Sequence, residues 1–447
     1  MHEHGSLMIS VSGVRGLLGR GMNPETAARF AAAFAEVTGA RTAVIGRDTR
    51  SSGPALVQAA VSALRFKGID VTDLGVVSTP TVEIMTVHRS ADCGIVVTAS
   101  HNDERWNALK FLDSRGEFPD AERVGRIRSL AEGGKVLFDP PESIGGFAED
   151  GSGDEVHVER IMGLELIEPE KVASLRLKAA VDCVNGAGSR IIPLLLERMG
   201  VETVLINTDI DSPFPHDPEP KPAALGDLAR TVEESGADIG FACDPDADRL
   251  VLVDGGGKVL SEELTLALAG DFVLGRQKGP MVVNLSTTRL IDDIASKHGV
   301  ASFRSPVGEA NVTALMKEKG AVIGGEGNGG VIYPAIHYGR DAMTGIALIL
   351  QHLAETGESL SEIAGSLPSY SIVKEKFEFE GDWNGYMERL KERFRGTYND
   401  SDGIRIDMGE GWVHVRRSNT EPVVRIIAEA GSEERASELV KEAAGSM

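Results

Sequence analysis

The chain has 447 residues, of which 42% are hydrophobic and 26% are charged, and its formal net charge is −22 at pH 7. This length exceeds what one hydrophobic core usually serves, so we expect about three or four domains. The acidity argues against binding to nucleic acid or to an anionic membrane, because both need a basic face.

Signals for targeting and for redox chemistry are few. The three cysteines, Cys93, Cys183 and Cys243, lie inside or just after apolar runs, and we interpret them as small core residues. No apolar run approaches the roughly 18 residues of a membrane span. The first residues lack the basic and apolar segments of a secretory signal. We therefore expect a cytoplasmic protein with no membrane or nucleic-acid partner.

Three strand–turn–helix–strand units recur along the chain. Their first strands span 43–45, 180–184 and 281–283. In each unit a polar turn precedes a helix, and the helices end at Gly68, Gly200 and Gly299. A glycine suits the C′ position of a helix, where φ is positive. These units are βαβ crossovers, which predict three similar α/β layers.

The end of the chain follows another pattern. A strand of period two at 372–379 precedes a helix at 383–395, three further strands and a closing helix at 433–447. Strands and helices without βαβ alternation indicate a smaller α+β domain. We predict an α/β fold of three similar mixed-sheet βαβ domains and a smaller α+β C-terminal domain around a central cleft. The expected domains are 1–149, 150–252, 253–368 and 369–447.

Polar signatures follow apolar segments at four places. Residues 98–102 (Thr-Ala-Ser-His-Asn) come directly after the apolar run 93–97, which is typical of a buried strand in a parallel sheet. Open α/β sheets bind ligands beyond the carboxyl ends of their strands. The other signatures are 244–249, 326–329 and 416–422. We expect the four signatures to form four walls of one cleft.

Three alternate aspartates, Asp244, Asp246 and Asp248, follow the apolar strand 239–243. Carboxylates at this spacing on a loop can converge on Mg²⁺, which favours oxygen ligands. The alternative is a solvated acidic loop, but three like charges at a strand end repel unless a cation neutralises them. An aspartyl-nucleophile phosphatase using Asp244 also stays open, although nothing downstream clearly supplies the rest of its mechanism.

Five motifs, in this order, resemble those of the α-D-phosphohexomutase superfamily. They match its SGxRG opening, TASHN phosphoserine loop, DPDxDR metal loop, GGExxG sugar loop and RxSNTEP phosphate loop, at 12–16, 98–102, 244–249, 325–329 and 416–422. The resemblance covers essentially the whole chain. It implies interconversion of hexose 1-phosphate and hexose 6-phosphate, with a hexose bisphosphate as intermediate and activator.

The resemblance also implies catalytic roles. Ser100 would bear the phosphoryl group. Mg²⁺ would be held by an oxygen on phosphorylated Ser100 and by Asp244, Asp246 and Asp248. The other implied catalytic residues are His101, Lys110, Arg15 and Arg249. Of these, Arg15 and Arg249 would flank the phosphoserine, and Lys110 is a candidate acid or base.

Two loops would bind the phosphosugar substrate. Glu326 and Asn328 would hydrogen-bond sugar hydroxyls. The phosphate that is not being transferred would be held by Arg416, Ser418, Asn419, Thr420 and Arg425. Charged and hydroxyl side chains of this kind suit an anion, because Arg can fork onto two phosphate oxygens.

One departure from the family concerns proton transfer. Bacterial members commonly end the sugar loop in a histidine, where this chain has Gly330. Another residue must then transfer the proton, and His337 is the nearest candidate. An equally open interpretation is that His337 is a loop histidine without a catalytic role. This loop is similar to archaeal-type mutases, which mix phosphoglucosamine and phosphomannose/phosphoglucose specificities. We expect a phosphoglucosamine mutase first and a phosphomannomutase/phosphoglucomutase second.

Two other functions and the assembly state stay open at the level of sequence. An aspartyl phosphatase is the enzymatic alternative, and a catalytically silent sugar-phosphate-binding protein is the alternative from another class. The sequence is compatible with a monomer or a homodimer.

Overall fold

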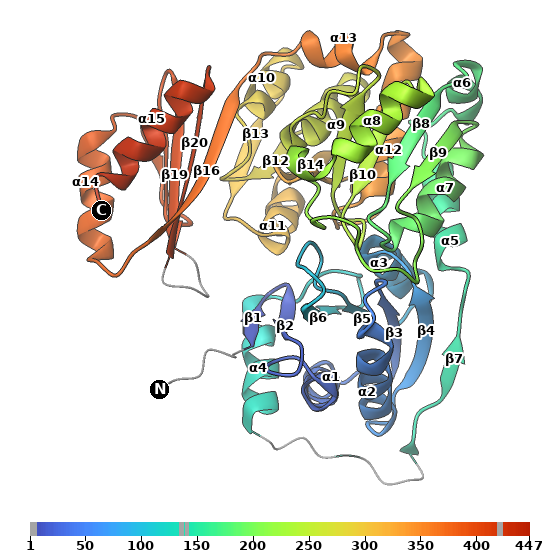
Figure 1. Ribbon diagram of the computed structural model, residues 1–447. Helices are drawn as coiled ribbons and strands as arrows, with labels where there is room; N and C mark the ends of the chain where they lie inside the picture. Colours follow the sequence, from blue (N-terminus) through green and yellow to red (C-terminus); the bar gives the residue numbers. More distant parts are fainter. Residues whose placement is uncertain (1–6, 134–137, 139–142, 418–422) are drawn as a thin grey trace.

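The chain folds around four β-sheets that follow one another in sequence, as the computed structural model in Figure 1 shows. The structure describes residues 7–133, 138, 143–417 and 423–447. The first three sheets are mixed and carry βαβ units, and the last is antiparallel. This confirms the predicted α/β fold with a smaller α+β unit at the end.

The first sheet has the order β1-β2-β6-β5-β3-β4-β7. Its strands are β1 Met8–Ser10, β2 Gly13–Leu17, β3 Thr42–Arg47, β4 Asp70–Val76, β5 Cys93–Val97, β6 Trp106–Leu112 and β7 Phe147–Glu149. Its helices are α1 Pro24–Thr38, α2 Gly53–Arg65, α3 Thr79–His88 and α4 Ala121–Gly133. Helix α1 shows why such boundaries form: Asn23 caps it, Pro24 opens it, and Gly39 ends it with φ of 63°.

The second and third sheets have four strands each. The second contains β8 Lys178–Asp182, β9 Glu202–Ile206, β10 Ile239–Cys243 and β11 Leu250–Asp254, with helices α5 Gly153–Met162, α6 Pro169–Ser174, α7 Gly188–Arg198 and α8 Gly226–Ser235. The third contains β12 Met281–Asn284, β13 Ser302–Ser305, β14 Ile323–Glu326 and β15 Gly330–Ile332, with helices α9 Glu262–Arg276, α10 Leu290–Lys297, α11 Glu309–Lys319, α12 Ala342–Thr356 and α13 Leu360–Gly365. The expected border at residue 252 falls inside β11, whose pairing with β10 keeps it on the second sheet.

The fourth sheet has the order β16-β20-β19-β18-β17. Its elements are β16 Ser371–Glu378, α14 Trp383–Arg393, β17 Thr397–Asn399, β18 Ile404–Asp407, β19 Gly411–Arg417, β20 Val423–Ala430 and α15 Glu433–Ala444. The sequence pattern predicts these elements closely and misses only β17, whose three residues are too short for a period of two to show.

The three βαβ sheets share one internal topology. In each, a central strand (β3, β8 or β12) pairs in parallel with two neighbours. The neighbour that comes later in the chain (β5, β10 or β14) then pairs antiparallel with the strand that follows it. The helix-ending glycines Gly68, Gly200 and Gly299 all have positive φ, at 72°, 70° and 67°, as predicted. The repeat therefore extends further than the sequence pattern indicated, to the antiparallel strands β6, β11 and β15.

That topology places three of the motifs at equivalent positions. The TASHN loop joins β5 to β6, the aspartate loop joins β10 to β11, and the sugar loop joins β14 to β15. Each loop therefore leaves the carboxyl end of a parallel strand and returns on an antiparallel one. Ligands bind at this edge in α/β sheets.

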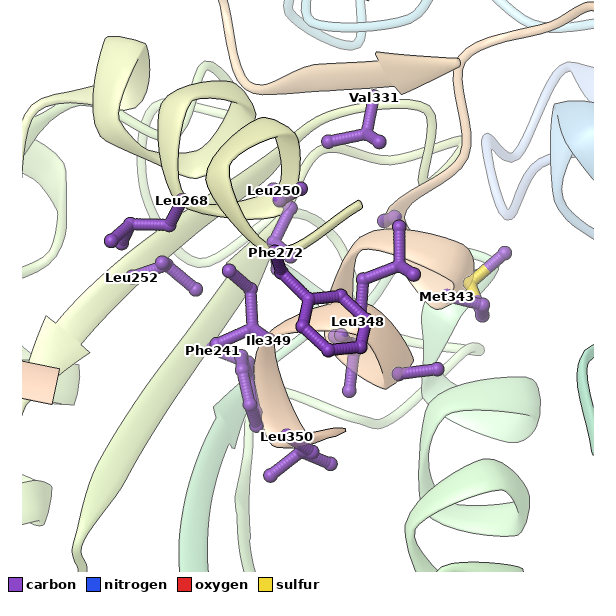
Figure 2. Packing of buried hydrophobic residues seen from close by; sticks show 14 of the residues in the cluster. Phe241, Leu250, Leu252, Leu268, Phe272, Val331, Met343, Leu348, Ile349 and Leu350 are labelled. Carbon is purple, nitrogen blue, oxygen red and sulfur yellow. The ribbon is translucent and has the colours of Figure 1, made fainter. Parts of the chain in front are cut away.

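The second and third sheets share one hydrophobic core. Figure 2 shows Phe241 of β10 and Leu252 of β11 packed with Phe272 of α9 and with Leu348 of α12, all of them buried. Because one core serves both sheets, their loops are held at fixed positions relative to each other. Within the described residues, no helix is long and apolar enough to cross a bilayer.

Candidate active site

A cavity of about 440 Å³ is lined by residues from all four sheets. The domain of the first sheet contributes Arg15, Ser100, His101 and Lys110, and that of the second contributes Arg249. The domain of the third sheet contributes Glu326, Asn328 and Arg340, and that of the fourth contributes Arg416 and Arg425. The fold therefore brings together these ten residues, which lie up to 410 residues apart in the chain. Ser418, Asn419 and Thr420 lie outside the described residues.

Ser100 is held in a conformation that non-glycine residues rarely adopt. Its φ is 51°, in the left-handed region. Its hydroxyl donates to Asp244 Oδ2 at 2.8 Å and lies 3.3 Å from His101 Nδ1. Its own N–H donates to Thr98 Oγ1 at 2.9 Å. The loop therefore turns the Ser100 hydroxyl away from the first sheet and toward the aspartate loop.

A buried ion pair that sequence reasoning missed braces this loop. Arg50 Nε donates to Asp48 Oδ2 at 2.9 Å, and Asp48 also accepts from Thr98 Oγ1 at 2.6 Å. The Arg50 guanidinium donates to the carbonyl oxygens of Ser100 and Asn102, both at 2.6 Å. The available signal was the polar turn after the first strand of the first βαβ unit, which brings the two residues to the same sheet edge.

The three aspartates converge, as predicted. One oxygen from each lies within 4.8 Å of the others, and all three side chains are buried. Ala247, between the last two, has φ of 52°, which tightens the loop. Burial, followed by the charges of Asp248 and Asp246, raises the pKa of Asp244 well above its usual value. A divalent cation would relieve this repulsion.

The donor set fits a hard cation. Asp246 Oδ2 is engaged by Thr79 and Lys110, and Asp248 Oδ2 by Arg340. The second oxygen of each carboxylate, Oδ1, is buried and has no hydrogen-bond partner among the described residues. Two buried acceptors without donors, beside the Asp244 oxygen that accepts from Ser100, form an oxygen site of the kind Mg²⁺ prefers.

Cations surround the aspartates. Lys110 Nζ lies 2.6 Å from Asp246 and 3.6 Å from Asp248. Although burial opposes it, these two carboxylates raise the pKa of Lys110, so its ammonium stays charged. Arg249 Nε lies 3.9 Å from Asp244 and 3.7 Å from Asp248. The Arg249 charge, and then burial, lower the pKa of His101 well below its ordinary value, which keeps this imidazole neutral.

Arg15 contacts the far end of the TASHN loop. Its guanidinium donates to Asn102 Oδ1 at 2.5 Å. Arg15 lies on β2, which pairs with β6, the strand that carries Lys110. Arg15, Arg249 and Ser100 all line the cavity.

The sugar-loop residues are fixed before any ligand arrives. Glu326 Oε1 accepts from Asn284 at 2.8 Å and from the Gly308 N–H at 3.1 Å. Asn328 Oδ1 accepts from the Gly330 N–H at 3.2 Å, and Asn328 lines the cavity. A carboxylate and an amide held in this way can bind hydroxyl groups.

Two arginines from neighbouring strands form the far wall. Arg416 of β19 and Arg425 of β20 are register partners, so their side chains share a face of the fourth sheet. Arg416 Nε lies 3.0 Å from Asp402 Oδ2. The buried Nε of Arg425 has no acceptor among the described residues. A paired, partly unsatisfied guanidinium set of this kind suits a phosphate group.

His337 lies elsewhere. Its ring is buried between Glu83 and Asp341, with Nδ1 2.9 Å from Glu83 Oε2 and Nε2 3.4 Å from Asp341 Oδ2. Asp341 also accepts from His157 at 2.9 Å. His337 is not among the described residues that line the cavity. The structure therefore does not bring it to Ser100, and its contacts are those of a residue at the junction of the first three domains.

Comparisons with known proteins identify the family of the chain. Family models described as phosphoglucomutase/phosphomannomutase match as α/β/α domain I at residues 7–135, domain II at 155–257, domain III at 261–370 and the C-terminal domain at 372–446. A probable phosphoglucosamine mutase of Methanopyrus kandleri is 39% identical over 96% of this chain and 95% of the relative. A phosphoglucomutase/phosphomannomutase of Thermococcus kodakarensis is 36% identical over 96% of each.

A solved structure from the same family has a similar fold. The phosphoglucomutase/phosphomannomutase family protein of Burkholderia thailandensis superposes with a TM-score of 0.85 at 28% identity, covering 98% of this chain and 97% of that one. Fold and site thus define a phosphosugar mutase, an isomerase that acts by phosphoryl transfer. The chain belongs to the phosphoglucomutase/phosphomannomutase family.

The His337 contacts predict a pH dependence of stability. Although burial opposes it, the carboxylates of Asp341 and Glu83 raise the pKa of His337 to about 9, above about 6.5 in an unfolded chain. The stabilisation is then fully present below about pH 6.5 and is lost as pH rises through about 9. It amounts to on the order of 3 kcal/mol.

Urea unfolding of wild type and His337→Gln at pH 6 and pH 9.5 measures this effect. We expect the wild type to lose more unfolding free energy over this interval than the variant, in which the titrating group is missing. Equal losses in the two proteins would contradict the assignment.

Proposed function

We propose that the enzyme interconverts hexose 1-phosphate and hexose 6-phosphate through phosphorylated Ser100 and a hexose bisphosphate, with glucosamine phosphate as its preferred substrate. The observation that carries the proposal is the single cavity lined by Ser100 at one wall and by Arg416 and Arg425 at the other. A site with a nucleophile at one end and an anion clamp at the other suits a substrate with phosphate at either end.

The transfer step needs a donor, an acceptor and charge neutralisation. The bond between phosphorus and Ser100 Oγ breaks as phosphorus bonds to the oxygen of the substrate hydroxyl. The proton of that hydroxyl passes to Ser100 Oγ, which regenerates the serine hydroxyl. His101, with Nδ1 at 3.3 Å from Oγ, is placed to relay that proton. Arg15 and Arg249 would balance negative charge on the moving group, which is the main demand of phosphoryl transfer.

Asp244, Asp246 and Asp248 would hold Mg²⁺ together with an oxygen on Ser100. When bound, the ion would neutralise phosphate oxygens during transfer. Lys110 and Thr79 orient Asp246 through its other oxygen. Orienting hydrogen bonds of this kind tune ligand geometry.

After transfer, the bisphosphate must turn within the cavity so that its other phosphate faces Ser100. Arg416 and Arg425 would then hold whichever phosphate is not reacting, and Glu326 and Asn328 would contact hydroxyls in both orientations. A hexose bisphosphate supplied from solution would phosphorylate Ser100 and so act as the activator. We also assign the enzyme to the cytoplasm, which agrees with three buried free thiols. We expect it to be a monomer or a homodimer.

The preference among sugars rests on the relatives. The Methanopyrus kandleri protein and a Methanosarcina acetivorans protein, 36% identical over 97% of this chain, are both named probable phosphoglucosamine mutases. The Thermococcus kodakarensis name supports mannose and glucose phosphates as the second candidates.

A substrate panel tests this preference. We expect kcat/KM to be highest for glucosamine phosphate among glucosamine, N-acetylglucosamine, mannose, glucose and pentose phosphates. A higher kcat/KM for mannose or glucose phosphate would favour the second candidate and leave the phosphoserine mechanism intact.

Ser100→Ala should abolish turnover and preserve the fold, because it removes the group that carries the phosphoryl. Intact-mass measurement of the purified wild type should show a substoichiometric phosphate that the variant lacks. Ser129→Ala, which changes an exposed serine on α4, is the matched control and should keep both activity and phosphate. Wild-type turnover by Ser100→Ala would exclude the phosphoserine mechanism.

Arg416→Ala should raise KM more than it lowers kcat. A contact to the phosphate that is not reacting persists from ground state to transition state, so its loss removes uniform binding. Truncating a charge-assisted bidentate contact costs about 1.5–3 kcal/mol, or roughly one to two decades in KM.

Arg417→Ala is the control, since Arg417 is exposed and its guanidinium lies 5.4 Å from the Trp383 ring centroid. Steady-state kinetics decides the question, with circular dichroism to check the fold. An unchanged KM in Arg416→Ala would mean that the fourth sheet does not bind substrate.

A further inference from the structure

Arg340 connects three carboxylates beside the cavity. Its Nη2 lies 2.5 Å from Asp248 Oδ2, its Nε 2.8 Å from Glu309 Oε2 and its Nη1 3.1 Å from Glu326 Oε2. Only 9% of Arg340 is exposed. These partners belong to the aspartate loop, to the start of α11 and to the end of β14. One guanidinium therefore joins the candidate metal site to the sugar loop.

The backbone on the C-terminal side of Arg340 is fixed independently of its side chain. Asp341 caps α12 by accepting from the N–H groups of Met343 and Thr344. The Asp341 N–H donates to the Val331 carbonyl at 2.9 Å, and the Ala342 N–H donates to the Ala247 carbonyl at 3.2 Å. The Arg340 side chain thus starts from a rigid backbone segment between β15 and the aspartate loop, and it needs little reordering to reach its partners.

Gly330 provides the space that the Arg340 side chain occupies. A Cβ atom at position 330 would lie 2.2 Å from Arg340 Cδ and 2.8 Å from Cγ. The next nearest atom is Asn328 Oδ1 at 3.1 Å. The φ of Gly330 is outside the left-handed region, so its backbone does not require glycine. Glycine is needed here because Arg340 passes through the volume of a β-carbon.

Arg340 holds one oxygen of Asp248 and one oxygen of Glu326. On Asp248 it holds Oδ2 and leaves Oδ1 without a donor. On Glu326 it holds Oε2, while Asn284 and the Gly308 N–H hold Oε1. Without the guanidinium, Asp248 Oδ2 and Glu326 Oε2 would each lose the nearest cation that restrains them, and three buried carboxylates would lose their common partner.

We propose that Arg340 is a positioning residue that fixes Asp248 for the metal and Glu326 for the sugar at the same time, and that Gly330 is the position that admits it. The part of this proposal that concerns Glu326 and the sugar (the sugar arm) rests on the proposed function. The part that concerns Asp248 and the metal (the metal arm) rests only on the geometry of the aspartates. Metal affinity and sugar-phosphate affinity are then coupled through one side chain.

Gly330→Ala is the sharpest probe, because it preserves every charge and collides chiefly with Arg340. Removing the guanidinium itself changes two things at once, since a cation near a metal site also repels the metal. Arg340→Lys is the second variant: it keeps the charge, but one ammonium cannot reach all three carboxylates in a fork. Gly125→Ala, on α4 with open space around the β-carbon, is the control.

The first readout is Mn²⁺ affinity, which electron paramagnetic resonance measures on the full-length enzyme in the absence of sugar phosphate. We expect Gly330→Ala and Arg340→Lys each to weaken Mn²⁺ binding by about tenfold, the usual cost of losing a group that orients a ligand. Gly125→Ala should bind as the wild type does. In an Arg340→Ala background, where the collision is gone, Gly330→Ala should change Mn²⁺ affinity by less than about twofold.

The second readout is steady-state kinetics with the preferred sugar phosphate. Gly330→Ala and Arg340→Lys should raise KM and lower kcat together, because Glu326 and Asp248 are both displaced. Mn²⁺ affinity within about twofold of wild type in Gly330→Ala would overturn the proposal, as would an equal cost of Gly330→Ala in both backgrounds. The metal arm uses no sugar, so it decides the role of Arg340 even if Ser100→Ala disproves the phosphoserine mechanism.

Discussion

The arrangement of the first three domains depends on neutralising three buried carboxylates. One carboxylate oxygen from each of Asp244, Asp246 and Asp248 lies within 4.8 Å of the others, and all three residues are buried. Ionised carboxylates in such a place need compensating charge. Lys110 comes from the first sheet and Arg340 from the third, so compensation is complete only when the domains meet in one arrangement. The electrostatics of the aspartate loop therefore fix the relative positions of the domains that carry the chemistry.

A repeated topology makes that meeting possible. The TASHN, aspartate and sugar loops are the same connection in three copies of one sheet pattern, each running from a parallel strand to an antiparallel one. The second and third copies share a core around Phe241 and Leu348, which removes freedom between their loops. The first copy is attached through the Thr79 N–H, which donates to the Asp246 carbonyl at 2.9 Å. Three similar loops can thus converge on one cavity.

Local charge in the cavity opposes the charge of the protein as a whole. The chain carries a net charge of −22, yet its cavity is lined by Arg15, Lys110, Arg249, Arg340, Lys374, Arg416 and Arg425. Focusing of the field inside a concave, partly desolvated site lets these cations attract a phosphosugar despite the acidic surface. The acidic exterior disfavours other polyanions, such as nucleic acid, so the distribution contributes to selectivity as well as to binding.

The sequence by itself determined the repeated βαβ units, the glycine helix ends, the C-terminal α+β pattern and the convergence of the aspartates on one loop. These follow from short-range periodicity, backbone restrictions and spacing, which a sequence contains directly. The tertiary structure alone decided the brace of Asp48 and Arg50, the Arg340 connection through Gly330, and the distance of His337 from the cavity. Each depends on which side chains meet between segments that are far apart in the chain, either in two loops of one sheet or between sheets, and local pattern carries no record of such contacts.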